Sequence, residues 1–297
     1  MRIAVTGSSG LVGSALVRSL TADGHQVVRL VRRAPADPDE VRWDPRAGTV
    51  DTASLGAVDA AVHLAGAGLG DKRWTAGYKR ELRDSRVLGT AAVARALAAM
   101  DPAPRVLLSG SAIGWYGDTG DVAVDETSPP GKGFLAETCI EWEAATAPAL
   151  EAGIRVAHLR TGLVVSEAGG AWGRMFPLFK AGVGGRLGSG RQYWSFVSLA
   201  DEIAAIRHVL DHDTIAGPVN LTAPNPVTNA EATKAMGKAL RRPTVFAVPP
   251  FALRAVLGEF ANDILVGQRV LPNVLTDSGF TFAHPTVREA IAAAIAD

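Results

Sequence analysis

The first thirty residues alternate two hydrophobic periods. The short apolar run "IAV" is typical of a buried strand, and Leu11, Ala15 and Leu20 then follow with helical spacing. Asp23-Gly24 ends that helix, and "QVVRLV" supplies a second strand. This order predicts a βαβ unit at the start of a doubly wound, Rossmann-like α/β domain with a parallel sheet.

Three further apolar runs extend the predicted sheet, at 58–68, 105–117 and 153–165, and the last of them is expected to be the final strand of this domain. Glycine and aromatic density rises after it, and the helical pattern "SLADEIAAIRHVL" then returns to the sheet. The sequence therefore predicts a first domain of residues 1–165, to which 196–216 return. A smaller mixed C-terminal lobe is expected from 166–195 plus 217–297.

Composition narrows the class of protein. The chain has 297 residues, 47% of them hydrophobic, which is enough for a large core. Thirty basic and thirty acidic side chains cancel, so no nucleic-acid partner is expected. Cys139 is the only cysteine, which suits a reducing compartment, and no apolar run approaches the ~20 residues of a membrane span. Because Met1 leads directly into a strand, we expect no signal peptide, no membrane partner and a cytoplasmic location.

The first strand and helix are joined by Gly7-x-x-Gly10-x-x-Gly13. In a strand–turn–helix setting, the first glycine permits the tight turn and the second lets the backbone approach a pyrophosphate. The third allows close packing, while the helix N-terminus faces the phosphates. The motif predicts a dinucleotide site, against the alternative of a purely structural turn.

The end of the second strand indicates which dinucleotide is bound. An NAD site usually has a carboxylate here, but this chain has Arg32 and Arg33, with no nearby acid before Asp37. A guanidinium can hold a 2′-phosphate through two hydrogen bonds. We therefore expect NADP(H), with Arg32 as the first candidate and Arg33 as the second, although both could be solvated loop residues.

Polar side chains gather where the predicted strands end. Ser109, Ser111 and Tyr116 follow the strand at 105–117, and ligands in open α/β sheets bind beyond the carboxyl ends of strands. His63 lies inside an apolar strand and is interpreted as a packed core residue. His208 and His212 have metal-ligand spacing on a helix, but no third ligand follows, so no metal site is predicted.

The motifs "TGSSGLVG", "HLAG", "SGSAIGWYG" and "LRTGLVV" resemble the extended short-chain dehydrogenase/reductase superfamily, in its group of nucleotide-sugar epimerases and dehydratases. "WYGDTG", "GSGRQYWSFV" and "GEFANDILVGQRVLPNVLTDSGFTF" resemble an epimerase-like subfamily that has its own C-terminal domain. The likeness runs from residue 1 to about residue 295.

The resemblance implies an NADP(H)-binding epimerase or oxidoreductase whose small-molecule substrate, including a nucleotide-linked one, carries a hydroxyl or carbonyl group. It leaves the oligomeric state open, with a homodimer as one option. Together, motif and resemblance assign the cofactor site to Gly7, Ser9, Gly10, Leu11, Val12, Gly13, Arg32, Arg33, Leu64, Ala65, Gly66, Arg86, Ser109, Arg160, Thr161 and Val164.

The superfamily normally combines a serine or threonine with Tyr-x-x-x-Lys, in which tyrosine is the acid/base and lysine lowers its pKa. Ser111 matches the serine position. The Tyr-x-x-x-Lys helix should fall at 134–143, where one register puts Leu135 and Cys139 at the two positions and the other Phe134 and Thr138. Neither register restores the pair.

Other residues could replace the missing pair. Tyr116 is a candidate proton donor, and Ser111 and Tyr116 are together the predicted catalytic residues. Lys132 is the nearest lysine but reads as a surface residue, and Asp118 lies in an ordinary turn sequence. Cys139 lacks a cationic neighbour in sequence, so it is interpreted as a buried packing residue.

A basic segment and an aromatic-rich lobe complete the candidates. In 71–86, Arg86 shares a helical face with two other cations and could meet a phosphate, against the alternative of a solvated face. Trp74 beside it, and Trp172 and Arg191 in the lobe, are the predicted substrate-contacting residues.

Two functions remain open from the sequence. The first is an NADP(H)-dependent oxidoreductase or epimerase that uses Ser111 and Tyr116. The second is a cofactor-binding sensor or regulatory scaffold that has lost its chemistry and reports NADPH through lobe closure.

Overall fold

The computed structural model describes residues 1–296, and a mixed sheet of eight strands forms its centre. The strand order is β13-β8-β6-β5-β1-β2-β3-β4, and all neighbours are parallel except the pair of β3 and β4. The strands are β1 (Arg2–Thr6), β2 (Gln26–Val31), β3 (Glu40–Asp44), β4 (Thr49–Val50), β5 (Ala60–His63), β6 (Val106–Ala112), β8 (Arg155–Thr161) and β13 (Gly217–Leu221).

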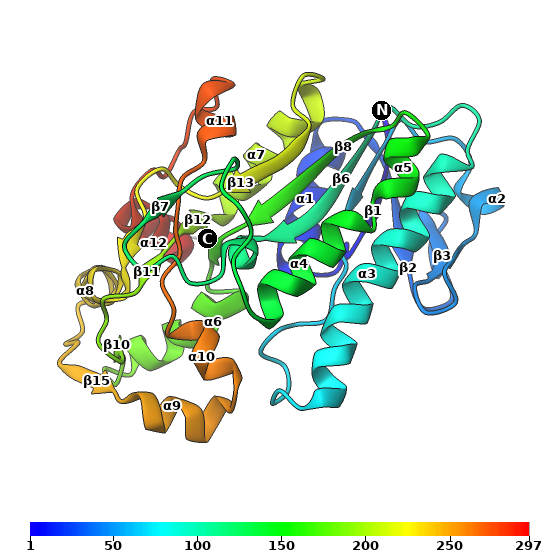
Figure 1. Ribbon diagram of the computed structural model, residues 1–297. Helices are drawn as coiled ribbons and strands as arrows, with labels where there is room; N and C mark the ends of the chain where they lie inside the picture. The colour runs from blue at the N-terminus through cyan, green and yellow to red at the C-terminus, as the bar shows by residue number, and fades with distance from the viewer. Residues whose placement is uncertain (297) are drawn as a thin grey trace.

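Helices cover both faces of this sheet (Figure 1), as a parallel sheet with two apolar faces requires. α1 (Leu11–Ala22) and α7 (Leu199–Asp211) pack together on one face. The other face carries α3 (Ala76–Ala98), α4 (Phe134–Ala144) and α5 (Ala147–Glu151), while the short α2 (Thr52–Leu55) precedes β5. A 3-10 turn, η1 (Ile113–Tyr116), follows β6 directly, and β7 (Ala123–Val124) comes after it.

The smaller lobe surrounds a second core and lies at the left of Figure 1. Its strands form short pairs rather than one sheet. Its elements are β9 (Leu163–Val165), α6 (Gly170–Lys180), β10 (Gly185–Leu187), β11 (Tyr193–Trp194), β12 (Phe196–Ser198), β14 (Val227–Thr228), α8 (Asn229–Leu240), β15 (Phe246–Val248), α9 (Pro250–Leu257), α10 (Phe260–Ile264), β16 (Arg269–Val270) and α12 (Val287–Ala296).

The boundary between the two parts differs from the predicted one. β13 was expected in the lobe, but it pairs with β8 over its whole length and forms the edge of the main sheet. The following α11 (Asn273–Asp277) packs on β13, and its Leu275 lies in the core beneath α1 and α7. The last strand of the main sheet is therefore β13 rather than the strand at 153–165, because the apolar residues of "GPVNL" complete the sheet's edge.

Within residues 1–296, no helix combines the length and the apolar character needed to cross a membrane.

Candidate functional site

The turn between β1 and α1 is shaped by backbone that only glycine allows. Gly7 has a φ of +67°, and a Cβ there would lie 2.8 Å from the carbonyl carbon of Leu64. A Cβ on Gly13 would overlap the carbonyl oxygen of Gly7. The helix therefore starts directly against the turn, and the turn directly against the end of β5.

The N-terminus of α1 is open to a ligand. Gly10 is its N-cap residue, and no side chain caps the first turn. The first N–H groups of a helix have no partner within the helix, and together with the helix dipole they favour an anion. Leu11 and Val12 carry two of these groups, while Ser9 is exposed in the turn before them. These residues fit the pyrophosphate of a dinucleotide.

The loop after β5 is fixed against the glycine turn by one hydroxyl. The side chain of Thr6 accepts hydrogen bonds from the backbone N–H groups of Leu64 (3.0 Å) and Ala65 (3.2 Å). It also contacts Nδ1 of His63 at 2.8 Å. His63 is fully buried, and burial lowers its pKa to about 4, so it is a neutral core residue as the sequence indicated.

Arg86 lies over the loop after β5. Its guanidinium is 3.4 Å from where a Cβ on Gly66 would stand, and it rests 5.1 Å above the Trp142 ring. Burial lowers its pKa, and its only hydrogen bond within the described chain goes to the Leu82 carbonyl. A cation that lacks an acidic partner beside this loop suits an anionic ligand.

The two arginines after β2 are not equivalent. Arg33 makes two hydrogen bonds to the buried carboxylate of Glu40, at 2.6 and 2.7 Å, and these hold the pKa of Glu40 below its usual range. Arg32 is exposed, and no ion pair engages it in the part of the chain described. Arg33 is thus occupied by a structural pair, whereas Arg32 is free to meet a 2′-phosphate.

Three polar residues stand in one row across neighbouring strands. Ser111 of β6 is the register partner of Arg160 of β8, which is in turn the partner of Asn220 of β13. All three lie near the carboxyl ends of their strands and are at most 5% exposed. A buried polar row at this edge needs partners, because an unpaired polar group in the interior is unfavourable.

Glu143 of α4 supplies the central partner. Its carboxylate accepts two hydrogen bonds from Arg160, at 2.8 and 2.9 Å, and one from the hydroxyl of Ser111 at 2.6 Å. Burial alone would lower the pKa of Arg160, but the hydrogen bonds and charge of Glu143 raise it above its ordinary value. Glu143 therefore joins α4 to both strands, because it accepts hydrogen bonds from Arg160 of β8 and from the Ser111 hydroxyl of β6.

Tyr116 joins this network from η1. Its hydroxyl accepts a hydrogen bond from Nη1 of Arg160 (3.0 Å) and donates one to Oδ1 of Asn220 (2.7 Å). Burial raises its pKa, and the charge of Arg160 partly offsets that rise. In this conformation the Tyr116 hydroxyl donates its proton to Asn220 and holds Arg160 in place.

α4 faces the same edge with apolar side chains. A Cβ on Gly114 of η1 would lie 3.3 Å from Cβ of Leu135 and 3.7 Å from Sγ of Cys139. Burial raises the pKa of the Cys139 thiol to about 12. Cys139 is a buried packing residue, as predicted, and Leu135 beside it offers no acid/base group.

The other candidate replacements lie outside the network. Lys132 is exposed. Asp118 accepts hydrogen bonds from the backbone N–H groups of Gly120 and Gly267, both at 3.1 Å, and therefore organises a turn.

The structure separates the three predicted substrate residues. Trp172 has no exposed surface and packs against Trp194 in the lobe core, so it lines no open pocket. Trp74 is 7% exposed and stacks on Phe260 of α10, with ring centroids 5.1 Å apart. Arg191 is exposed. The bulky indole of Trp172 in a glycine-rich segment suggested a pocket wall, but it fills the second core instead.

The remaining predicted residues lie near the same edge. Ser109 is buried two register positions before Ser111, on the same strand. Thr161 ends β8 and donates a hydrogen bond to Glu202 at 2.9 Å, while Val164 lies in β9. Away from this edge, His208 stacks on His212 and contacts the Ser278 hydroxyl at 2.9 Å.

Sequence reasoning missed two members of the network. Glu143 was not among the predicted site residues, and Asn220 fell in the segment 217–297 that was predicted to belong to the lobe. Both left a signal: an arginine inside the apolar strand "RVAHLRT" requires a buried carboxylate, and the asparagine in "GPVNL" requires a hydrogen-bond partner.

Comparisons with known proteins identify the family of the chain. Residues 3–221 match the model of the NAD dependent epimerase/dehydratase family, and residues 248–294 match a domain of unknown function, DUF1731. An epimerase family protein of Mycobacterium bovis is 49% identical over 290 residues, which cover 97% of this chain and 96% of the relative.

Two solved structures resemble the whole chain. The human epimerase family protein SDR39U1, solved with NADPH, has a TM-score of 0.93 at 30% identity and is covered completely, as is this chain. A nucleoside-diphosphate sugar epimerase from Corynebacterium glutamicum has a TM-score of 0.82 at 36% identity, over 98% of this chain and 57% of that longer one. With its parallel sheet, glycine turn and family match over most of its length, this chain belongs to the NAD dependent epimerase/dehydratase family.

Proposed function

We propose that this protein is an NADP(H)-dependent oxidoreductase or epimerase in which Ser111 and Glu143 move the proton that Tyr-x-x-x-Lys moves in other members. The observation that carries the proposal is the 2.6 Å hydrogen bond from the Ser111 hydroxyl to a carboxylate that Arg160 fixes. The substrate is a small or nucleotide-linked compound with a hydroxyl or carbonyl group.

The choice of cofactor rests on the loop after β2. Arg32 is available for a 2′-phosphate, whereas the nearest buried acid, Glu40, is neutralised by Arg33. The glycine turn and the uncapped start of α1 would hold the pyrophosphate. A relative that covers the whole chain was solved with NADPH, which supports the same choice.

The proton path follows from the donors and acceptors. The hydroxyl of Ser111 donates to Glu143, so its lone pairs are free to accept a hydrogen bond from a substrate hydroxyl. In oxidation, Ser111 takes the substrate proton as its own proton passes to Glu143. In the reductive half of an epimerisation, the proton held on Glu143 returns through Ser111 to the carbonyl oxygen. In a reduction that starts from NADPH, Glu143 first takes up a proton from solvent and then delivers it along the same path. A nicotinamide bound beside this edge would supply or accept the hydride.

Arg160 and Tyr116 are positioning residues in this scheme. Arg160 holds the Glu143 carboxylate in its orientation, and Tyr116 with Asn220 holds the third guanidinium nitrogen. A fixed carboxylate keeps the Ser111 hydroxyl aligned before a substrate arrives, as preorganised catalytic groups require.

A sensor without chemistry is the second candidate, and the contacts between the lobes favour it. Lys79 of α3 pairs with Glu259 at 2.7 Å, and Arg174 pairs with Asp71 at 3.1 Å. These contacts and the Trp74 stack tie the loop after β5 to the C-terminal lobe, so a ligand at that loop can change how the lobes meet.

One experiment separates the two candidates. The protein is incubated with NADPH and a panel of carbonyl compounds and nucleotide sugars, while NADPH absorbance and product epimers are followed. The enzyme predicts turnover that Ser111→Ala and Glu143→Gln abolish without loss of NADPH binding. Tight NADPH binding that changes tryptophan fluorescence, with no turnover across the panel, would contradict the enzyme and support the sensor.

A further inference from the structure

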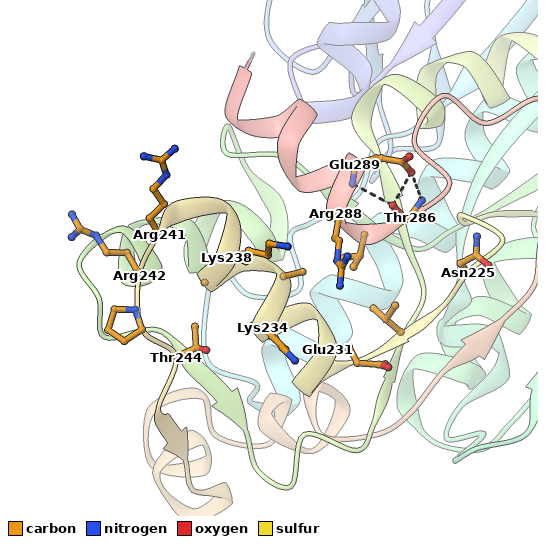
Figure 2. A pocket seen from close by; sticks show the side chains of 15 residues that line it. Asn225, Glu231, Lys234, Lys238, Arg241, Arg242, Thr244, Thr286, Arg288 and Glu289 are labelled. Atoms are coloured by element: carbon orange, nitrogen blue, oxygen red, sulfur yellow. Dashed lines mark hydrogen bonds between the residues drawn. The ribbon is translucent and has the colours of Figure 1, made fainter.

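A second, separate surface of the lobe carries an excess of positive charge. Helices α8 and α12 border an open groove of about 1340 Å³, which Figure 2 shows. Its lining cations are all exposed, and no ion pair in residues 1–296 engages them. They are Lys234, Lys238, Arg241, Arg242 and Arg288.

The groove's two acids offset only part of this charge, because five cations face two carboxylates and each carboxylate caps a helix. Glu231 accepts hydrogen bonds from the backbone and hydroxyl of Thr228, both at 2.8 Å, and so caps α8. Glu289 does the same for Thr286 at the start of α12, at 2.9 and 2.7 Å. The surface between the helices is therefore electropositive in a chain whose net charge is zero.

Two of the cations occupy positions that local stability disfavours. Arg288 stands in the first turn of α12, where the helix dipole is unfavourable for a positive charge. Arg241 ends α8 in the left-handed region, with a φ of 53°, where glycine or asparagine is usual. In Figure 2, Lys238 and Arg288 extend into the space between the helices, while Arg241 and Arg242 lie past the end of α8.

We propose that this groove binds an acidic, partly apolar segment of another polypeptide. Its volume exceeds the ~300–1000 Å³ of typical small-molecule sites, which favours a chain segment over a nucleotide. Val227 and Ala235 supply apolar lining between the cations. Beyond Pro243 and Thr244 the exposed side chains of Val245 and Phe246 extend the surface.

Other anionic partners fit the groove less well. The groove itself has no aromatic lining and Phe246 beside it offers one ring, whereas nucleic-acid binding stacks successive bases on several aromatic side chains. Its cations border a hollow between two helices, whereas a membrane surface would contact a convex face. An extended segment in which acidic and apolar side chains alternate could pair with the cations of the groove and also contact its apolar lining.

The test measures fluorescence anisotropy of a labelled peptide of about twelve residues that alternates glutamate and leucine, long enough to span the groove. We expect saturable binding that weakens as salt rises. In Lys234→Glu/Lys238→Glu the affinity should fall about tenfold or more, because two attractive charges become repulsive. Arg18→Glu/Arg42→Glu, which changes the same charge on exposed residues of α1 and β3, should keep the affinity within about twofold.

A third variant separates binding from folding. Arg288→Glu should weaken peptide binding and yet leave the melting temperature unchanged or higher, because an acid in the first turn suits the helix dipole. NADPH binding should be normal in every variant. The proposal is overturned if the unsubstituted protein does not bind the peptide. It is also overturned if the two double variants bind the peptide with equal affinity. Tighter binding of an oligonucleotide or of phosphatidylserine vesicles through the same lysines would overturn it too.

Discussion

Two neighbouring edges of the site at the carboxyl end of the sheet differ. The glycine turn between β1 and α1 meets the family's pattern with backbone alone, whereas the edge formed by β6, β8 and α4 lacks the family's Tyr-x-x-x-Lys pair. At the first edge, Gly7 and Gly13 allow contacts that any Cβ would block. At the second, Ser111, Glu143 and Arg160 come from three elements and form one buried network. In this chain the backbone of the glycine turn thus follows the family's pattern while the side chains of the second edge differ from it.

The largest effect is expected from Glu143→Gln, which keeps the shape of the side chain but removes its charge. If Glu143 receives the proton from Ser111, turnover should fall by about 10²–10⁴-fold while NADPH affinity is retained. Steady-state rates on the best compound of the panel measure this. Cys139→Ala, one helical turn away on α4, is the control and should stay active; equal losses in both variants would contradict the role of Glu143.

Arg160→Leu tests the network as a structural unit. It leaves Glu143 buried without its ionic partner, and such a loss typically destabilises a fold by about 3–5 kcal/mol. Chemical denaturation measures the free energy of unfolding. The double variant Arg160→Leu/Glu143→Leu should recover part of that loss, because no charge remains buried alone. Additive effects of the two substitutions would show that the pair does not act as a unit.

Gly7→Ala should damage the cofactor edge selectively. The positive φ of Gly7 is unfavourable for alanine by roughly 1–2 kcal/mol, and the added Cβ would press on the end of β5. Gly24→Ala is the matched control, since Gly24 has a φ of +79° but open space around it. Fluorescence titration should show that Gly7→Ala loses NADPH binding and that Gly24→Ala keeps it. NADPH binding that is kept in Gly7→Ala and lost in Gly24→Ala would refute the role of the glycine turn in cofactor binding.

Arg32→Ala should remove the preference for NADPH over NADH. One charge-assisted pair is worth about 1.5–3 kcal/mol, so NADPH affinity should fall by roughly tenfold or more while NADH affinity is unchanged. Arg33→Ala is the comparison, because Arg33 is engaged with Glu40 and its loss should keep the preference. Equal affinity of the unsubstituted protein for both cofactors would contradict this assignment.

The last prediction concerns stability against pH and a buried carboxylate, Glu202, that forms no ion pair with an arginine in the part of the chain described. Burial raises the pKa of Glu202 to about 8, and the hydrogen bond from Thr161 lowers it only in part. Because the folded pKa lies above the unfolded one, stability is highest below the unfolded value and falls as pH rises towards 8. Glu202→Gln should make the melting temperature depend less on pH over this range. If the melting temperature of Glu202→Gln falls with pH as steeply as that of the unsubstituted protein, Glu202 is not the group responsible.

The two edges also differ in what their sequence reveals. Gly7-x-x-Gly10-x-x-Gly13 lies within one turn, so strand, turn and helix are legible from neighbouring residues. Glu143 and Asn220 come from segments remote from Ser111, and only strand register brings Ser111, Arg160 and Asn220 into one row. The edge strand β13 was misplaced for the same reason, because sequence order does not say which sheet a short apolar run joins.

Trp172 and Arg33 show a second limit of sequence-based prediction, which is that residue type alone does not fix a residue's role. Their residue types suit the roles predicted for them, an aromatic pocket wall and a phosphate ligand. The structure places Trp172 in the lobe core and pairs Arg33 with Glu40. Composition does not distinguish these settings, because burial and pairing depend on residues elsewhere in the chain.

A double-mutant cycle on hydride transfer from NADPH, in single-turnover experiments with the best compound of the panel, tests the central claim most directly. If Ser111 and Glu143 form one proton path, Ser111→Ala and Glu143→Gln should each slow the step to a similar extent, and the double variant should be little slower than either. Tyr116→Phe should lose less, since Tyr116 only positions Arg160. Additive losses, or a larger loss in Tyr116→Phe than in Glu143→Gln, would contradict the replacement of the Tyr-x-x-x-Lys pair by Ser111 and Glu143.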